Sequence, residues 1–151
     1  MSDLQEAYDK LPFALPSFDT LNSEFEIDTI EHTSFLIREI VRRMQSSLEE
    51  VMKIIEELLH PESSLSSMIE AEALSDEQRK AVLSLYRALG SRYKQGLIVL
   101  VNHDEQAMAT YIAQIVQQWS DVRTQVAQLL STVKQQWDKE QTEEEDNGYF
   151  G

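Results

Sequence analysis

Apolar residues recur with helical spacing along most of the chain, beginning with residues 29–59. There a seven-residue apolar repeat is accompanied by further apolar residues three or four positions on. Positions three and four apart lie on one face of an α-helix, so this segment is predicted to form a long helix with a broad apolar face. His60-Pro61 ends it, because the residue before a proline is pushed out of helical geometry. The predicted face consists of Ile37, Ile40, Val41, Met44, Leu48, Val51, Ile54, Ile55 and Leu58.

A second long helix is predicted over residues 75–101. Ser75-Asp-Glu-Gln78 has the pattern of a capping box, in which the serine hydroxyl accepts a hydrogen bond from the Gln78 amide and the glutamine side chain reaches back. Gly90 and Gly96 lie within the helix, either as weak points or as places where a neighbouring backbone comes close. Between the two long helices, residues 63–74 are predicted to form a short helix that crosses the end of the bundle. The apolar face of the second helix consists of Val82, Leu85, Leu89, Tyr93, Leu97 and Leu100.

The most regular pattern lies in the last predicted helix, residues 104–138. Its apolar residues are spaced alternately four and three apart, which is the spacing of a coiled-coil seam. Asn102 or Asp104 is expected to cap its first turn. At 1.5 Å per residue this helix is about 50 Å long, longer than the helix before it, so one end is expected to project past the bundle or to pair with another chain. Both an intramolecular core and a homo-oligomeric coiled coil fit the seam, which consists of Met108, Ile112, Ile115, Trp119, Val122, Val126, Leu129 and Val133.

Together these segments predict an all-α fold. The connections between the long helices are short, so neighbouring helices are expected to run antiparallel. The predicted organisation is an acidic N-terminal strap (residues 1–28), a bundle of three long helices with the short cross-helix (29–138) and a flexible acidic tail (139–151). Residues 8–27 carry two prolines and many large apolar side chains, so part of the strap is expected to lie extended over the bundle.

Composition narrows the functional classes. The 151 residues carry a formal charge of −14 and no cysteine, which leaves neither disulfide nor thiolate chemistry and favours the cytoplasm. Residues 1–28 contain seven acids and residues 138–151 contain six, each with one lysine, so the two ends contribute −6 and −5. The longest apolar run, residues 97–101, is far shorter than a bilayer span, so a soluble protein without a membrane partner is expected. The acidic balance makes nucleic acid an unfavoured partner.

No segment of the sequence carries a recognisable catalytic motif. Phosphate-binding glycine loops, nucleophile elbows and zinc-protease helices are all missing from it. Glu57 and His60 have the Glu-x-x-His spacing of carboxylate-bridged metal bundles, but such a site needs a second pair, and the last helix has no histidine. His32 and His103 lie near other predicted helix ends. The expectation is therefore a non-enzymatic protein without a cofactor or metal.

The basic residues of the first two long helices form two clusters. Since those helices are predicted to be antiparallel, both clusters are expected toward the same end of the bundle. Ordinary pairing with neighbours such as Glu39 is one interpretation. A contact for phosphate or nucleic acid, or for an acidic segment such as this protein's own tail, is the other. The clusters are Arg38, Arg42 and Arg43 on the first helix and Arg87, Arg92 and Lys94 on the second.

The chain ends in Glu-Glu-Glu-Asp-Asn-Gly-Tyr-Phe-Gly, residues 143–151. The acids and Gly148 favour an exposed segment, and two aromatic rings stand beside the terminal carboxylate. Such an end suits capture in a partner pocket, with the rings as anchors and the carboxylate held by backbone amides or a basic side chain. Binding of a protein partner is therefore predicted for Tyr149, Phe150 and Gly151. A solvated tail without a partner is the alternative.

Two resemblances concern this end alone. Tyr149-Phe150-Gly151 resembles the hydrophobic–tyrosine–any tail with which proteasome activators dock into intersubunit pockets, with Phe150 at the position where tyrosine is usual. The bacterial proteasome activator, an ATP-independent ring of small helical bundles, combines such a tail with an all-α body. Acids followed by an aromatic are also similar to the tails of single-stranded-DNA-binding proteins, which recruit other proteins. The resulting hypothesis is an adaptor that recruits a partner through its tail. A ring protein similar to proteasome activators and a polyanion-associated accessory protein are the alternatives.

Overall fold

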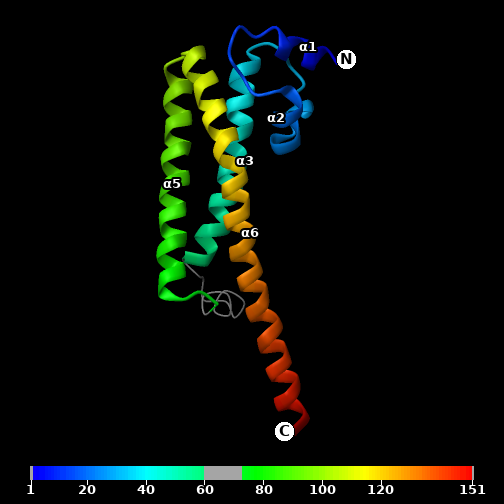
Figure 1. Ribbon diagram of the computed structural model, residues 1–151, viewed down its shortest axis with the longest axis vertical. Coiled ribbons are helices and arrows are strands. Elements are labelled where there is room, and N and C mark those ends of the chain that lie inside the picture. The colour runs from blue at the N-terminus through cyan, green and yellow to red at the C-terminus, as the bar shows by residue number, and fades with distance from the viewer. Residues whose placement is uncertain (1, 60–72, 151) are drawn as a thin grey trace. The chain divides into compact units, whose positions relative to one another are not determined.

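The structure, a computed structural model, describes residues 2–59 and 73–150, with the side chains of the last helix described as far as Lys139 (Figure 1). All regular elements in these residues are helices, as the sequence predicts. They are the short helices α1 (Asp3–Asp9) and α2 (Phe18–Phe25), the 3-10 turn η1 (Ile27–Thr29) and the long helices α3 (Leu36–Leu59), α5 (Asp76–Val101) and α6 (Glu105–Phe150). The short cross-helix predicted over residues 63–74 falls almost entirely outside the described residues.

Two of the long helices begin with side-chain caps. At α5 the capping box is confirmed, because the Ser75 amide donates to Gln78 Oε1 at 2.8 Å and the Gln78 amide donates to Ser75 Oγ at 3.2 Å. At α6 the amide of Ala107 donates to Asp104 Oδ1 at 3.1 Å. Asp104 rather than Asn102 is therefore the capping residue of α6.

The third long helix, α3, begins at Leu36, because the residue before it leaves helical geometry. Phe35 has a left-handed backbone with φ 57°. Its carbonyl accepts hydrogen bonds from the amides of Arg38 at 3.0 Å and Glu39 at 3.2 Å. Large side chains rarely adopt a positive φ, so this turn defines a sharp boundary between the N-terminal segment and α3.

The helix α6 continues beyond the predicted boundary at residue 138. It has 46 residues and ends at Phe150. The residues after Asp138 include lysine, glutamates and glutamine, which are good helix formers. The side chains of residues 140–150 and all of Gly151 lie outside the described part, so the predictions for the side chains of the tail stay predictions.

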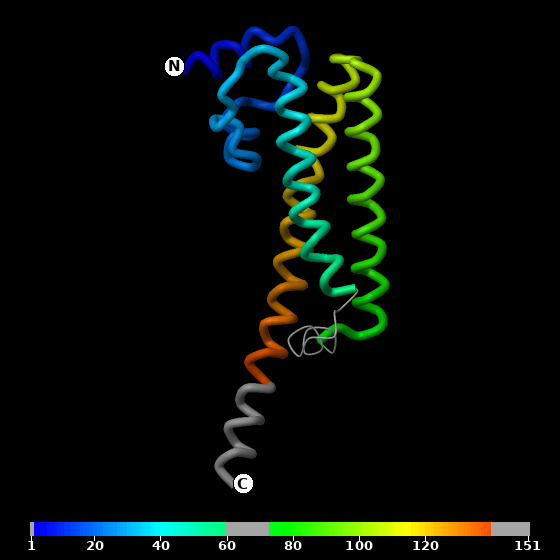
Figure 2. The backbone as a smooth tube through the Cα atoms, turned by 180° about the vertical axis from the view of Figure 1, so that it is seen from behind, coloured from blue at the N-terminus to red at the C-terminus, as the bar shows by residue number. Residues whose placement is uncertain are grey.

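The helices form two compact units, each assembled from separate stretches of the chain. Unit 1 comprises residues 1–50 and 89–120, and unit 2 comprises residues 51–88 and 121–151. In unit 1 the start of α3, the end of α5 and the start of α6 lie at the same end (Figures 1 and 2). This arrangement agrees with the predicted antiparallel order of the long helices.

The core of unit 1 follows the predicted apolar faces of α3 and α6, but on α5 the predicted Tyr93, Leu97 and Leu100 are only half-buried and Val99, which was not predicted, is buried. Burial of each large apolar side chain stabilises the fold by about 1.5–3 kcal/mol. The most deeply buried residues of the long helices here are Ile37, Ile40, Val41, Met44, Leu48, Leu89, Met108 and Ile112.

The N-terminal segment covers this core, but it is helical where an extended strap was predicted. The Ser17 hydroxyl accepts a hydrogen bond from the Thr20 amide at 3.2 Å and so caps α2. Leu21 and Phe25 are buried on one face of α2, at helical spacing. Among residues 8–27, extended or irregular chain is confined to the short stretch that contains the two prolines and to the residues next to α2.

The core of unit 2 follows the predicted seams with three exceptions. Ile54, predicted on the apolar face of α3, is 37% exposed, and Val51 and Leu129 are only half-buried. The buried apolar residues of this unit are Ile55, Leu58, Leu74, Val82, Leu85, Val122, Val126 and Val133. Within the described stretches, none of the helices combines the length and the apolar character that a bilayer crossing requires.

Candidate functional site

The three arginines of the predicted basic patch on α3 have different environments. Arg42 forms an ion pair with Glu39, at 2.8 Å between Nη1 and Oε1, and its side chain is 55% exposed. An exposed pair of this kind contributes at most about 1 kcal/mol. Arg38 is half-buried, and its Nε is buried without a hydrogen-bond partner among the described residues. Pairing with Glu39, which was one of the two interpretations, is thus observed for Arg42.

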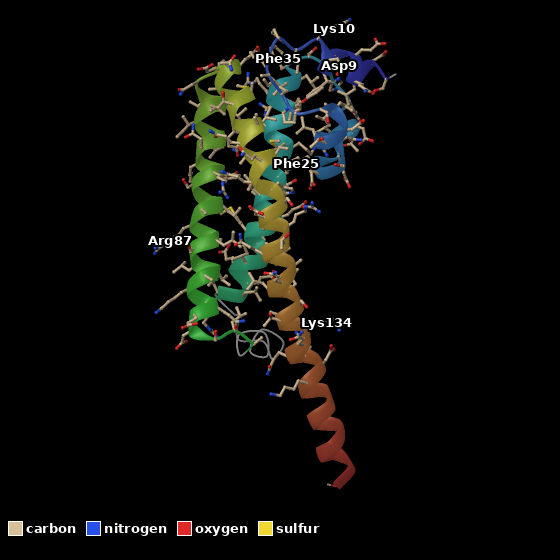
Figure 3. The ribbon with its side chains drawn as sticks, viewed as in Figure 1. Asp9, Lys10, Phe25, Phe35, Arg87 and Lys134 are labelled. Atoms are coloured by element: carbon tan, nitrogen blue, oxygen red, sulfur yellow. The ribbon has the colours of Figure 1, made fainter. Side chains whose placement is uncertain are left out.

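The basic residues of α5 are divided between the two units. Arg92 and Lys94 belong to unit 1, together with the three arginines of α3, whereas Arg87 belongs to unit 2. Arg92 is half-buried and Lys94 is exposed. Arg87 is exposed, and its side chain points away from α5 (Figure 3). Five of the six predicted residues therefore belong to unit 1, and Arg87 belongs to unit 2.

A polar cavity of about 470 Å³ lies between the end of α2 and the exposed side of α3. Two of the predicted basic residues, Arg42 and Arg43, line it. They are outnumbered by four glutamates in the lining, so the cavity carries a net negative charge. A polyanion would be repelled here. The remaining lining residues are Glu24, Phe25, Glu26, Glu39, Ser46, Ser47 and Glu50.

A polar cluster inside unit 1 joins α3, α5 and α6. Gln45, which is 7% exposed, donates from Nε2 to the Tyr93 carbonyl at 3.0 Å. The Tyr93 hydroxyl donates to Glu49 Oε1 at 2.5 Å, and this hydrogen bond is the main cause of a raised Tyr93 pKa. Sequence reasoning missed Gln45, because a glutamine beside Met44 on an otherwise apolar stripe has no motif that marks it as buried.

Gly96 explains how the three helices approach each other in this cluster. A Cβ atom at this position would lie 2.5 Å from Gln45 Nε2 and 2.8 Å from the Tyr111 hydroxyl. The sequence interpretation expected a neighbouring backbone close to Gly96, but the groups that come close are the side chains of Gln45 and Tyr111. The Tyr111 hydroxyl is buried without a hydrogen-bond partner among the described residues, and burial raises the pKa of Tyr111 to about 12, with the charge of Arg92 lowering it in part.

A second cavity lies in unit 2 between α5 and α6. Its volume is about 300 Å³, and none of its lining residues is charged. We call it the α5/α6 groove. No feature of the sequence pointed to it, because glutamines and threonine alternate with apolar residues along its walls. It is lined by Gln78, Ala81, Val82, Leu85, Gln125, Gln128, Leu129 and Thr132.

Two predicted features fall at or beyond the limits of the described residues. Tyr149 and Phe150 belong to the last turn of α6, but their side chains and Gly151 are not described. The Glu57 and His60 pair is not described either, since His60 lies in the stretch of residues 60–72. In the rest of the chain that the structure does describe, no three histidine, aspartate or glutamate side chains gather closely enough to hold a metal ion.

The comparisons with known proteins add no functional assignment to this geometry. No protein-family model matches the sequence, and no curated protein or solved structure matches it significantly.

Proposed function

We propose that this protein is a non-enzymatic adaptor that recruits a protein partner through the C-terminal end of α6. The observation that carries the proposal is the unequal length of two neighbouring helices. α6 has 46 residues and α5 has 26. Gln78, in the first turn of α5, lines the same groove as Thr132 of α6. The part of α6 that follows Thr132 therefore extends beyond the start of α5, and it ends in the two aromatic residues.

The chemistry of this end defines the kind of partner. Four consecutive acids precede Gly148, and Tyr149 and Phe150 stand directly before the terminal carboxylate. Aromatic rings are strong anchors in apolar pockets, and acids around them favour a basic rim on the other protein. The expected partner surface is thus a hydrophobic pocket flanked by lysine or arginine. The lack of cysteine in the chain fits action in the cytoplasm.

The test is capture of a partner by purified full-length protein and by three variants. Deletion of residues 143–151 and the double change Tyr149→Ala with Phe150→Ala are both expected to abolish capture. The double change should leave the helical circular dichroism signal unchanged, and the deletion should remove only the signal of the α6 residues that it takes away. Thr142→Ala, a neutral change just before the acids, is the matched control and should capture normally. Capture that is unaffected by both tail variants would remove the proposal.

A second candidate is a proteasome-activator-like ring protein, which the helical body and the Tyr149-Phe150-Gly151 end both support. This candidate predicts ATP-independent stimulation of peptide hydrolysis by a proteasome core particle. Deleting the last three residues should eliminate the stimulation. If the tail captures a protein without stimulating hydrolysis, the adaptor proposal stands and this candidate fails. The third hypothesis, a polyanion-associated protein, is weakened by the net negative lining around Arg42 and Arg43.

A further inference from the structure

Another cavity lies in the N-terminal segment, between α1 and α2, and all of its lining residues belong to unit 1. Its volume is about 320 Å³. Three of the residues that line it are aromatic. They are Tyr8 from α1, Phe13 from the loop that follows α1, and Phe18 from α2. We call it the α1/α2 cavity.

The aromatic walls of this cavity are held in place by contacts with each other and with the loop. The rings of Tyr8 and Phe18 meet edge to face, with 5.7 Å between their centroids and 66° between their planes. The Tyr8 hydroxyl donates to the Pro16 carbonyl, which ties the far end of the loop to α1. Phe13 and Phe18 are only half-buried, so part of each ring stays accessible to a ligand.

The hydroxyl groups of the lining are already engaged in hydrogen bonds. The Tyr8 hydroxyl is bonded to the Pro16 carbonyl. The Ser17 hydroxyl accepts from the Thr20 amide at 3.2 Å and shares a second hydrogen bond with the Thr20 hydroxyl at 2.8 Å. A ligand with several N–H or O–H groups, such as a sugar or a primary ammonium with its three donors, would therefore find few hydroxyl partners here.

The charged residues of the lining are all acidic. Asp9 and Asp19 line the cavity and are exposed, whereas Lys10, the base next to Asp9, does not line it. Burial and the charge of Asp9 together raise the pKa of Tyr8 to about 12, so the field of this carboxylate reaches the aromatic wall. A cation is therefore attracted into this cavity and an anion is repelled.

We propose that the α1/α2 cavity binds the trimethylammonium group of an organic cation. The face of an aromatic ring attracts a cation within about 6 Å, and aromatic-lined pockets bind quaternary ammonium groups in this way. The methyl groups of such a cation replace its N–H donors, so it needs no hydrogen bond from the engaged hydroxyls. The two carboxylates add attraction without a direct contact. The site belongs to unit 1 and does not involve the C-terminal end of α6, on which the proposed function depends.

Isothermal titration calorimetry of the full-length protein with choline, at about 0.15 M salt to screen non-specific attraction, tests this site. Saturable binding at one site per chain is expected. Dimethylbutanol, in which carbon replaces the charged nitrogen of choline, and ethanolamine, in which hydrogens replace the methyl groups, should each bind at least about tenfold more weakly. Choline that binds no more tightly than dimethylbutanol would overturn the proposal.

A peptide that contains trimethyllysine is the second probe, with the unmethylated peptide as its control. Binding of choline would support a free small molecule as the source of the group, and binding of the trimethylated peptide alone would support a modified protein. Failure of both probes to bind would overturn the proposal.

Two variants, measured with the probe that binds, locate the site. Phe13→Leu keeps the apolar bulk but removes one ring, so it should weaken binding about two- to thirtyfold, the range for one cation–π contact. Asp9→Asn removes one carboxylate at constant shape and should also weaken binding. The matched controls are Phe35→Leu and Asp28→Asn, which change exposed residues outside the lining and should bind as the wild type does.

Circular dichroism checks that all of these variants stay folded. Unchanged affinity in both Phe13→Leu and Asp9→Asn would overturn the assignment of the site. Deletion of residues 143–151 should leave binding of the cation intact, so this result is independent of partner capture by the tail.

Discussion

Gly96 is the residue on which the close approach of three helices in unit 1 depends. The two groups that a Cβ atom would meet are both held in place. Gln45 is bonded to the Tyr93 carbonyl, and Tyr111 is 3% exposed. Neither side chain can move aside without breaking a contact of the core. The space beside Gly96 is thus occupied by its neighbours, and the glycine is more than a weak point in α5.

Replacing Gly96 with alanine is therefore expected to destabilise the protein. Alanine improves helix propensity by about 1 kcal/mol, but forcing an extra methyl group into a filled core costs about 1–3 kcal/mol. The net change should be a lower free energy of unfolding, measured by urea denaturation. Ser91→Ala, at an exposed position of the same helix, is the control and should change stability by less than about 0.5 kcal/mol. A more stable Gly96→Ala variant would show that the cluster repacks freely.

The buried tyrosines predict how stability depends on alkaline pH. Burial raises the pKa of Tyr111 and of Tyr8 to about 12, from an ordinary value of 10.0. Below pH 10 the phenols are protonated in the folded and in the unfolded chain, so their contribution does not vary there. Between pH 10 and 12 the unfolded chain releases these protons while the folded chain retains them, so stability falls as pH rises.

Urea midpoints measured from pH 9 to pH 12 check this expectation. The wild type should lose stability across the window, and Tyr111→Phe should lose less, because one of the phenols with a raised pKa is gone. Combining it with Tyr8→Phe should flatten the profile further. Equal slopes for the wild type and the double variant would mean that the two phenols titrate normally in the folded chain.

At the scale of helices, Leu21 and Phe25 bury one face of α2 against unit 1, and Phe25 adds an aromatic contact. Phe25 is 2% exposed, and its ring lies 5.0 Å from the ring of Trp119, centroid to centroid, with 44° between the planes. Figure 3 places Phe25 on the side of α2 that faces the long helices. Trp119 belongs to the predicted seam of α6, so part of that seam is covered by the N-terminal segment and is closed to any other helix.

Removing this ring should loosen the packing of α2 on unit 1. Phe25→Ala is expected to cost about 3–5 kcal/mol, the range for deleting a large aromatic side chain from a core. Trp119 would then be exposed to solvent, and its fluorescence should shift to longer wavelength. Phe35→Ala is the control, because Phe35 is 70% exposed and its removal should change stability by less than about 0.5 kcal/mol. A Phe25→Ala variant with unshifted fluorescence would mean that α2 does not depend on this contact.

The sequence predicted the three long helices because their apolar periodicity is continuous and their caps are local. The capping box at Ser75 is formed by four consecutive residues, and the 4-3 spacing of apolar residues in α6 can be recognised without knowing which helices pack against it. The N-terminal segment was harder, since Pro12 and Pro16 suggested extended chain although the Ser17 cap and the spacing of Phe18, Leu21 and Phe25 favour a helix. Ile54 was predicted to be buried but is 37% exposed, whereas Gln45, which no sequence feature marks as buried, is 7% exposed. Both differences arise because burial depends on which element lies alongside each residue.

At the scale of the whole molecule, most of the net charge belongs to the two ends of the chain. The two ends carry −6 and −5 of the net −14, whereas the lining of the α5/α6 groove contains no charged residue. The sequence predicted the charge distribution fully, since it is a matter of counting. It did not predict the groove, because a groove exists only once two helices lie together.

The division of the chain between the two units has a consequence for its synthesis. The residues of unit 1 end at Ser120, but unit 2 needs the stretch that begins at Asp121. A ribosome therefore delivers every residue of unit 1 before it delivers the α6 portion of unit 2. Until that portion emerges, Val82 lacks the α6 side chains that line the groove with it, and the α3 and α5 portions of unit 2 stay open to chaperones and proteases.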